Sequence, residues 1–499
     1  MRPNPYAYVG QPVSESRFIG RAPECQRLRD RLYGSEEFCA SSALVGLPRT
    51  GKTSIARRVL AEVPRSLGEV ACIPVEINCG IFRSPRDLFR QICLDVVRTW
   101  AQRGGASAEA LRLSVELGQL EDDLAWKRAV QQFFEECHAR RVRAICLLDE
   151  FDSARFLFEG QGDFLHLVRT LAGSTAYGVG LLLASKRRLP EIAHAAGLST
   201  GYWANVLDVV PVSVFSEVEH TLHCNRARSE GLELDGHCAA VIQRYCGRHP
   251  FLLDRAAYTL WAMRAAGDVD TEELERRLRI DAVRLFQEVA EILEDSGDLS
   301  KALQVFCGPT FDLKPQNISE LEEHGVIVSA WRTGTSGVVE SICPAFVDFL
   351  NALGHQVPFW GLWAQTERML RTAIQERLEH LWQADWRQQV LRRRPGLTAM
   401  LVEAEARRNR EAPFLGGASQ ARILDYTYPL DLFELLNADW TNLGDPLLGG
   451  DAGQWRRDFG QLARVRTPAA HNRLELLADS DISKARGVCE RLLELLAPL

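Results

Sequence analysis

The residues with the clearest chemical meaning form one short stretch, Gly46-Leu47-Pro48-Arg49-Thr50-Gly51-Lys52-Thr53. Its spacing is that of a phosphate-binding loop (P-loop): two glycines let the backbone wrap closely, so that successive N–H groups point at a β-phosphate. A helix beginning at Gly51-Lys52 adds the positive end of its dipole. We expect Lys52 to reach the β- and γ-phosphates and Thr53 to offer its hydroxyl to Mg²⁺. The stretch therefore predicts a site for ATP or ADP with Mg²⁺.

A second signal is acidic and follows an apolar run over residues 143–148. We expect Asp149 to hold the water shell of Mg²⁺ and Glu150 to orient the attacking water. The alternative for Glu150 is that it only solvates the end of a strand. Asp152 is expected to cap a helix rather than to support the metal.

Polar residues also follow the apolar run 178–184, as Ser185-Lys186-Arg187-Arg188. A side chain such as Ser185 would lie beside the γ-phosphate here, and an arginine could reach a neighbouring nucleotide. A solvated run of charge is the alternative for Arg187 and Arg188.

The third signal lies near the C-terminus, where Arg466 and His471 are five positions apart. Pro468 suits the first turn of a new helix, which would bring the two side chains close together. A histidine can take the proton of a 2′-hydroxyl or protonate a leaving oxygen, and an arginine can stabilise charge on phosphorus, so the pair could cleave RNA without a metal. The alternatives are that both residues are structural or bind RNA without cutting it, and that Arg464 is the active arginine.

Strands and helices alternate over the first 200 residues, with strands expected at 41–45, 70–77, 143–148, 178–184 and 207–212. This alternation predicts an α/β domain with a parallel sheet covered on both faces.

Helices without intervening strands follow from Ser216 to about Ala266, and another is expected over 281–305. A short helix that opens over 313–321, with a would-be recognition helix at 317–324, a turn at 333–337 and a strand at 338–342 then predict a winged helix. Three acids on its short helix would repel DNA phosphates, so we expect an internal hinge. The remainder is almost all helix, with a break near 448–451.

The expected domains are an extended lead-in over 1–15, a P-loop ATPase domain over 16–215, a helical lid over 216–280, a winged helix over 281–355 and a helical effector domain over 356–499.

The composition is that of a folded protein, with 46% hydrophobic and 25% charged residues and a net charge of −7. This charge excludes a generally basic nucleic-acid coat. The 13 cysteines have no zinc-type spacing, and the first residues form no signal peptide. We expect a cytoplasmic protein that does not enter a membrane.

Five features come in a familiar order: Phe18-Ile19-Gly20-Arg21, the P-loop, Asp149-Glu150, Ser185, and Gly247-Arg248-His249-Pro250-Phe251-Leu252-Leu253. Over residues 5–355 they resemble the signal-transduction ATPases with numerous domains (STAND), within the AAA+ and origin-recognition-like group. Such proteins act as switches between ADP and ATP forms and can assemble into rings.

This resemblance implies that the Phe-x-Gly-Arg segment borders the adenine and that the turn at Pro250 sets the lid against the nucleotide. His249 would either approach a phosphate or serve in packing. The residues expected at the nucleotide are Gly46, Thr50, Gly51, Lys52, Thr53, Ser54, Asp149, Ser185 and Pro250, with Thr53 and Asp149 at the metal.

Residues 360–499 resemble the HEPN superfamily through Glu367-Arg368-Met369-Leu370-Arg371, the apolar helix 430–440, a helix with Trp455 and Phe459, and the Arg466 to His471 turn. Many members are metal-independent endoribonucleases with an Arg-x4–6-His motif, whose active site forms between two copies. The residue after the arginine is usually polar and often Asn in that family, and it is Thr467 here.

Together these features predict an ATP-dependent switch that controls a C-terminal endoribonuclease, as a toxin of bacterial antiphage defence or stress-induced growth arrest. RNA is the expected substrate, at least a homodimer the expected assembly, and a protein or phage-derived molecule a possible trigger. The alternative is an origin-recognition-like switch that binds DNA or protein and has a non-catalytic, RNA-binding C-terminal domain.

Overall fold

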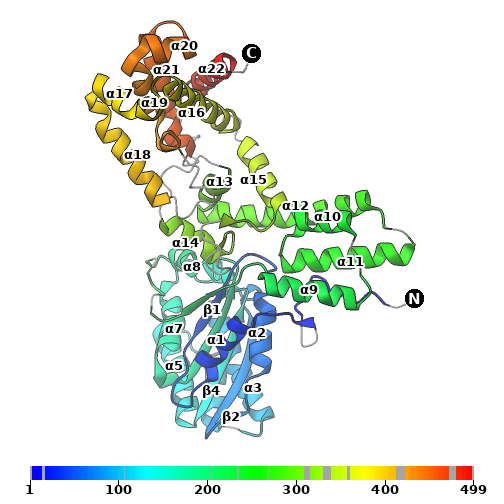
Figure 1. Cartoon of the computed structure of the whole chain (residues 1–499). Helices are drawn as coiled ribbons and strands as arrows, with labels where there is room; N and C mark the ends of the chain where they lie inside the picture. The colour runs from blue at the N-terminus through cyan, green and yellow to red at the C-terminus, as the bar shows by residue number, and fades with distance from the viewer. Residues whose placement is uncertain are drawn as a thin grey trace. The chain divides into compact units, whose positions relative to one another are not determined.

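The computed structural model describes residues 3–13, 17–105, 107–199, 201–203, 205–232, 235–267, 269–307, 315–329, 339–356, 360–411, 422–470 and 479–496. The predicted turn at 333–337 and His471 lie outside these residues. The chain divides into two compact units (Figure 1). The nucleotide unit comprises Met1–Ile292, Ser319–Val328 and Ile342–Pro344, and the C-terminal unit comprises Leu293–Ile318, Ser329–Ser341 and Ala345–Leu499.

A six-stranded sheet forms the centre of the nucleotide unit, in the order β2-β3-β4-β5-β1-β6. Its strands are β1 (Ser42–Val45), β2 (Ser66–Leu67), β3 (Val70–Asn78), β4 (Val142–Asp149), β5 (Val179–Ser185) and β6 (Asp208–Pro211). All neighbours are parallel except β2 and β3. The predicted parallel sheet is therefore confirmed, and the antiparallel edge strand β2 was not foreseen. Because β5 lies between β1 and β4, the carboxyl ends of these three strands meet at one edge of the sheet. The P-loop follows β1, and polar residues lie at the ends of β4 and β5.

Both faces of this sheet are buried, which is why its central strands read as continuous apolar runs. Along β4, Ala144, Cys146 and Leu148 pack on one face, and Ile145 and Leu147 pack on the other. The first face is covered mainly by α3 (Pro85–Gln102), α4 (Ala108–Glu116), α5 (Asp123–Ala139) and α7 (Gly162–Gly173), and the second by α1 (Ala22–Tyr33) and α2 (Lys52–Ala61). The sequence did not predict α4.

Three helices follow the sheet where the sequence predicted two or three (Figure 1). They are α9 (Glu217–Ser229), α10 (Gly236–Cys246) and α11 (Pro250–Ala266), and the long α12 (Thr271–Ser296) comes next. A capping box starts α9: the Ser216 hydroxyl accepts from the Glu219 backbone, and the Glu219 carboxylate accepts from the Ser216 backbone.

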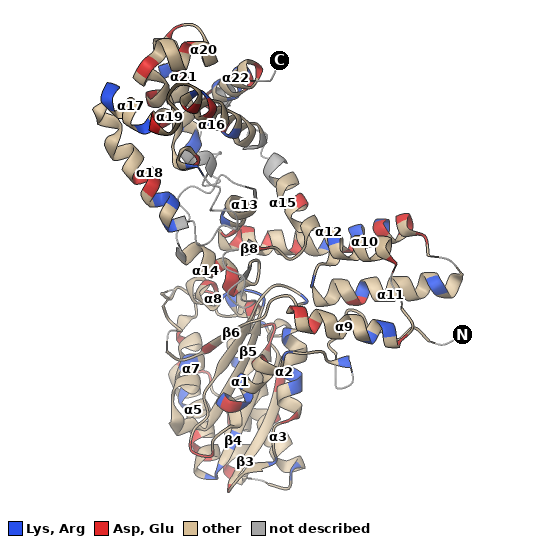
Figure 2. Ribbon diagram, in the orientation of Figure 1, with Lys and Arg blue, Asp and Glu red and all other residues tan. Residues whose placement is uncertain are grey.

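The next elements are α13 (Leu299–Cys307), α14 (Pro315–His324), the paired strands β7 (Val328–Ser329) and β8 (Val339–Glu340), and α15 (Pro344–Gln356). Helix α14 carries three acidic residues, Glu320, Glu322 and Glu323 (Figure 2). These elements agree with the pattern that suggested a winged helix, and the assignment itself stays a prediction.

The C-terminal unit is helical around one core. Its main helices are α16 (Trp360–Trp382), α17 (Trp386–Arg393), α18 (Thr398–Glu411), α19 (Pro429–Leu436), α20 (Asp445–Leu448), α21 (Ala452–Ala470) and α22 (Asp479–Leu496). The predicted break falls between α20 and α21. The prediction for Pro468 was wrong, since it lies in the last turn of α21 instead of starting a new helix.

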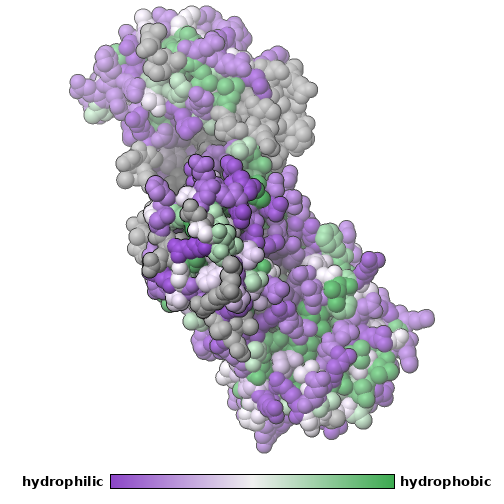
Figure 3. Space-filling model, turned by 90° about the vertical axis from the view of Figure 1, so that its right-hand side faces the viewer, coloured by the Kyte–Doolittle hydropathy of each residue, from purple (hydrophilic) through white to green (hydrophobic). Residues whose placement is uncertain are grey.

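The face in Figure 3 is mostly hydrophilic, and its hydrophobic residues gather in small separate patches. Within the described parts of the chain, no helix is both long enough and apolar enough to cross a membrane.

A buried ion pair braces the start of the C-terminal unit. The Arg371 guanidinium lies 2.8 Å from the Glu367 carboxylate and donates to the Thr427 carbonyl at 2.8 Å. The Trp363 indole also donates to Glu367, at 3.2 Å. Glu367 and Arg371 are 5% and 6% exposed, so neither charge has water as an alternative partner.

We predict that Arg371→Met destabilises the C-terminal unit by about 3–5 kcal/mol, because it leaves the buried Glu367 carboxylate without its charged partner. The double variant Glu367→Leu/Arg371→Met should recover most of this loss, since no charge is then left unpaired. Hydrogen exchange of the α16 amides measures both effects. A single variant as stable as the parent would contradict the role given to the pair.

Candidate nucleotide site and candidate ribonuclease site

The P-loop connects β1 to α2 at the carboxyl edge of the sheet. A Cβ on Gly46 would lie 2.0 Å from the Val212 carbonyl oxygen, so only glycine fits there. Gly51 precedes α2 with φ of 99°, a left-handed conformation that glycine adopts without strain. Arg49 is also left-handed, and its guanidinium lies 4.4 Å from the centre of the Phe251 ring on α11. The loop is thus shaped by its own glycines and held against the lid.

Lys52 stands at the first position of α2 and turns back over the loop. Its ammonium donates to the carbonyls of Gly46 at 2.9 Å and Leu47 at 2.6 Å. Burial lowers its pKa to about 8, against the opposing effect of Asp152 and Asp149. A bound phosphate would place a negative charge next to this ammonium and favour its charged form. Lys52 is therefore suited to the predicted contact.

Thr53 and Asp149 meet although they are 96 residues apart. The Thr53 hydroxyl donates to the Asp149 carboxylate at 3.0 Å. Asp149 is 8% exposed, and burial raises its pKa. A hydroxyl and a carboxylate side by side are the oxygen ligands that Mg²⁺ accepts, so these two residues fit the predicted metal.

Glu150 follows in a left-handed conformation, with φ of 53°, which is uncommon outside glycine. This bend turns its exposed side chain over the end of β3. One of its carboxylate oxygens would lie 2.6 Å from a Cβ placed on Gly80, and Asn78 pairs in register with Asp149. No sequence motif had marked Asn78 or Gly80 as neighbours of this carboxylate.

Ser185 ends β5 in register with Val45 and is fully buried. Its hydroxyl donates to the Arg187 carbonyl at 2.7 Å and accepts from the Arg187 backbone at 3.0 Å. Its side chain therefore closes a local turn. Its carbonyl accepts from the Gly46 backbone at 3.3 Å, which joins β5 to the P-loop.

Arg187 and Arg188 do not form a solvated run of charge, because these residues are only 6% and 8% exposed. Both guanidiniums lie close to Glu191, at 3.7 and 3.0 Å. The helix-cap prediction for Asp152 was also wrong, because its carboxylate accepts from the Lys186 backbone at 3.3 Å. Buried pairing explains these departures, and spacing alone did not reveal the partners.

Arg21, from the Phe-x-Gly-Arg segment, joins the P-loop to the lid. Its guanidinium donates to the carbonyls of Thr50 at 3.2 Å and Ser213 at 2.6 Å. Its backbone N–H donates to Glu219 of α9 at 2.6 Å. Gly20 has φ of +65°, and a Cβ there would lie 2.3 Å from the Glu219 side chain. Glu219 was not predicted from the sequence.

A small cavity of about 50 Å³ lies beside the P-loop. Its lining includes Phe18, Ile19, Thr50, Ser54, Phe215 and Pro250. Apolar walls next to the phosphate loop suit a nucleotide base. The structure thus brings Pro250, Thr50 and Ser54 together, as the sequence predicted, and it adds His223 and Asp254, which no motif had marked.

His249, just before Pro250, is fully buried. Burial lowers its pKa to about 3, although the Pro48 backbone favours the charged form. Its imidazole is therefore neutral at physiological pH and packs against the P-loop.

Arg466 lies near the end of α21 and is 5% exposed. Its guanidinium lies 4.2 Å from the centre of the Tyr428 ring, and that of Arg407 lies at the same distance. Arg464 is 68% exposed and lies 3.4 Å from Asp481. His471 is outside the described residues.

Comparison with known proteins agrees with the nucleotide unit. Residues 38–192 match the family described as an AAA domain. This P-loop domain is of the AAA type. No protein of curated function matches the chain in sequence.

Solved structures similar to the chain include the following three. The Walker-type ATPase PABY2304 of Pyrococcus abyssi has 15% identity and a TM-score of 0.47, over 68% of this chain and 99% of that chain. The ORC2 protein of Aeropyrum pernix, in ADPNP–ADP complexes, has 15% identity and a TM-score of 0.32, over 67% and 96%. Cdc6p of Pyrobaculum aerophilum has 13% identity and a TM-score of 0.32, over 67% and 96%.

We predict that Lys52→Ala weakens binding of a fluorescent ATP analogue on the order of 100-fold, since charge-assisted hydrogen bonds to phosphate are lost. Arg57→Ala is the matched control, because Arg57 lies on the same helix, half-exposed, and pairs with Glu76 at 2.6 Å. It should bind within about twofold of the parent. Equal affinity of the Lys52→Ala variant and the parent would remove the P-loop assignment.

Proposed function

We propose that this chain is an ATP-dependent switch that controls a metal-independent endoribonuclease in its C-terminal unit. The observation that carries the switch is the meeting of Lys52, Thr53, Asp149 and Glu150 at one edge of an AAA-type domain. Lys52 holds phosphate, Thr53 and Asp149 hold Mg²⁺, and Glu150 orients the water that hydrolyses ATP. When bound, Mg²⁺ neutralises phosphate charge.

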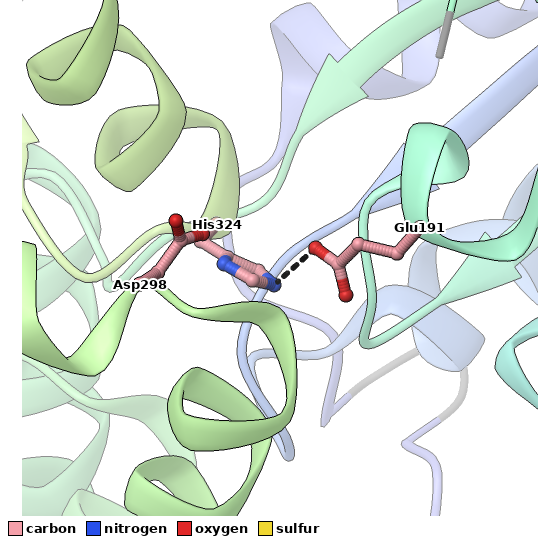
Figure 4. A group of neighbouring side chains, drawn as sticks. All are labelled: Glu191, Asp298 and His324. Atoms are coloured by element: carbon pink, nitrogen blue, oxygen red, sulfur yellow. Dashed lines mark ion pairs between the residues drawn. The ribbon is translucent and has the colours of Figure 1, made fainter. Parts of the chain in front are cut away.

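The hinge of the proposed switch is the winged helix, and contacts within the nucleotide unit support it. Glu320 on α14 lies 3.8 Å from Arg188, and His324 lies 3.7 Å from Glu191 (Figure 4). Burial raises the pKa of Glu323 on the same helix. An acidic helix packed in this way suits a hinge better than a reader of DNA. Arg188 and Glu191 follow β5 directly, so α14 contacts the segment next to the nucleotide edge.

The nuclease is proposed at Arg466 and His471. His471 takes the proton of a 2′-hydroxyl, the 2′-oxygen attacks phosphorus, the bond to the 5′-oxygen breaks, and the 5′-oxygen leaves with the proton that His471 returns. The products are a 2′,3′-cyclic phosphate and a 5′-hydroxyl, and Arg466 stabilises the charge on phosphorus. Arg466 is covered here by Tyr428, which suits a nuclease held inactive until activation turns the arginine outward.

The setting we propose is bacterial antiphage defence or growth arrest, with the active site formed in a homodimer or larger assembly. A second candidate is a switch whose C-terminal unit does not cut RNA. The burial of Arg466 favours it, because a buried arginine also serves packing.

We predict that the full chain, incubated with total cellular RNA with and without ATP, yields fragments with 2′,3′-cyclic phosphate ends in one of the two nucleotide conditions. His471→Ala and Arg466→Ala should each slow cleavage about 10²–10⁴-fold. Arg464→Ala distinguishes the two arginines, because Arg464 is two residues away and exposed: it should cleave like the parent if Arg466 is the active arginine, and lost cleavage would assign that role to Arg464. Cleavage unchanged in His471→Ala would exclude the nuclease and leave the second candidate.

A further inference from the structure

A cluster of titratable side chains lies on the lid, outside the residues that contact phosphate in the proposed site. His220, His223 and Cys224 occupy one turn of α9. The Cys224 sulfur lies 3.6 Å from Nε2 of His220, and His223 is its neighbour in the helix. The thiol thus faces one imidazole and adjoins a second.

The cluster continues to a carboxylate on a second helix. Nε2 of His223 lies 2.9 Å from Asp254 of α11, and the Tyr8 hydroxyl donates to the same carboxylate at 3.2 Å. Burial opposes the charged form of His223, but the hydrogen bonds to Asp254 and Cys224 outweigh it and raise the pKa of His223. Asp254 therefore orients His223, as a carboxylate orients the histidine beside a reactive nucleophile.

Hydrogen bonds from His220 and then His223 lower the pKa of the Cys224 thiol to about 6, although burial opposes this. Among the described cysteine side chains, Cys39 and Cys224 are partly exposed and the others are buried. Burial raises the pKa of Cys39 to about 12, and no imidazole among its described partners offsets that. A thiol that has a lowered pKa and is accessible to solvent has the properties of a reactive cysteine.

The cluster also borders the proposed base cavity. His223 and Asp254 line that cavity together with Phe215 and Pro250. A change at Cys224 therefore reaches the cavity wall through one residue, His223.

We propose that Cys224 is a peroxide-reactive thiol whose oxidation alters the nucleotide cavity through His223 and Asp254. His220 accepts the thiol proton, and the sulfur attacks one oxygen of the peroxide. The O–O bond breaks, an S–O bond forms, and the departing hydroxide takes the proton back as water. Sulfur is oxidised by two electrons to a sulfenic acid, and hydrogen peroxide is reduced to water. The added oxygen lies on the residue next to His223, which lines the cavity.

The first test exposes the full chain briefly to hydrogen peroxide near pH 7, traps sulfenic acid with dimedone and maps the labelled peptides by mass spectrometry. Cys224 should be labelled at least tenfold faster than Cys39, and His220→Asn should slow labelling of Cys224 at least fivefold. The proposal that Cys224 is a reactive thiol would be overturned if Cys224 were labelled no faster than Cys39. It would also be overturned if His220→Asn left the labelling rate of Cys224 unchanged.

The second test concerns the cavity and rests on the proposed nucleotide binding. Peroxide should weaken binding of a fluorescent ATP analogue at least threefold in the parent and leave Cys224→Ser unchanged. Equal loss in both proteins, or no loss in the parent, would overturn the coupling to the cavity. If neither untreated protein binds the analogue, the nucleotide proposal fails and this coupling fails with it, whereas the labelling ratio still decides the reactivity of Cys224.

Discussion

The hydrogen bond between Thr53 and Asp149 is the contact on which the nucleotide site depends. It joins the helix after the P-loop to the end of β4, across a sheet in which β5 lies between β1 and β4. Parallel strands place their carboxyl ends at one edge, so a loop, a hydroxyl and two carboxylates from distant parts of the sequence converge there. Without this strand order, Lys52 and Glu150 would not share a site.

A second set of contacts ties this edge to the lid. Arg21 holds the carbonyls of Thr50 and Ser213, while its backbone holds Glu219. Arg49 lies over Phe251 of α11. These contacts connect the lid to the P-loop, as the proposed switch requires. The Cys224 cluster lies on the same lid, so the proposed redox input would act on the same elements as the nucleotide.

The sequence predicted those parts of the site that depend on backbone geometry. The glycine spacing of the P-loop, the acidic end of β4 and the end of β5 follow from how parallel strands are built, and all of them were placed correctly on the sheet. It could not predict pairings between helices distant in sequence, since these depend on packing. For Arg188 the sequence left open a solvated charge and a contact to a neighbouring nucleotide, and the structure pairs it with Glu191 and Glu320. Pro468 looked like a helix start, because local preference favours that position over the end of a helix.

The central claim is that the nucleotide state of the AAA-type domain sets the activity of the C-terminal unit. The most direct measurement is the rate of RNA cleavage, at saturating ATP and Mg²⁺, by Glu150→Gln, which should retain bound ATP, and by Lys52→Ala, which should not bind it. The rates of the two variants should differ at least tenfold. Measurable and equal rates would show that the nuclease does not respond to the nucleotide, and would contradict the claim.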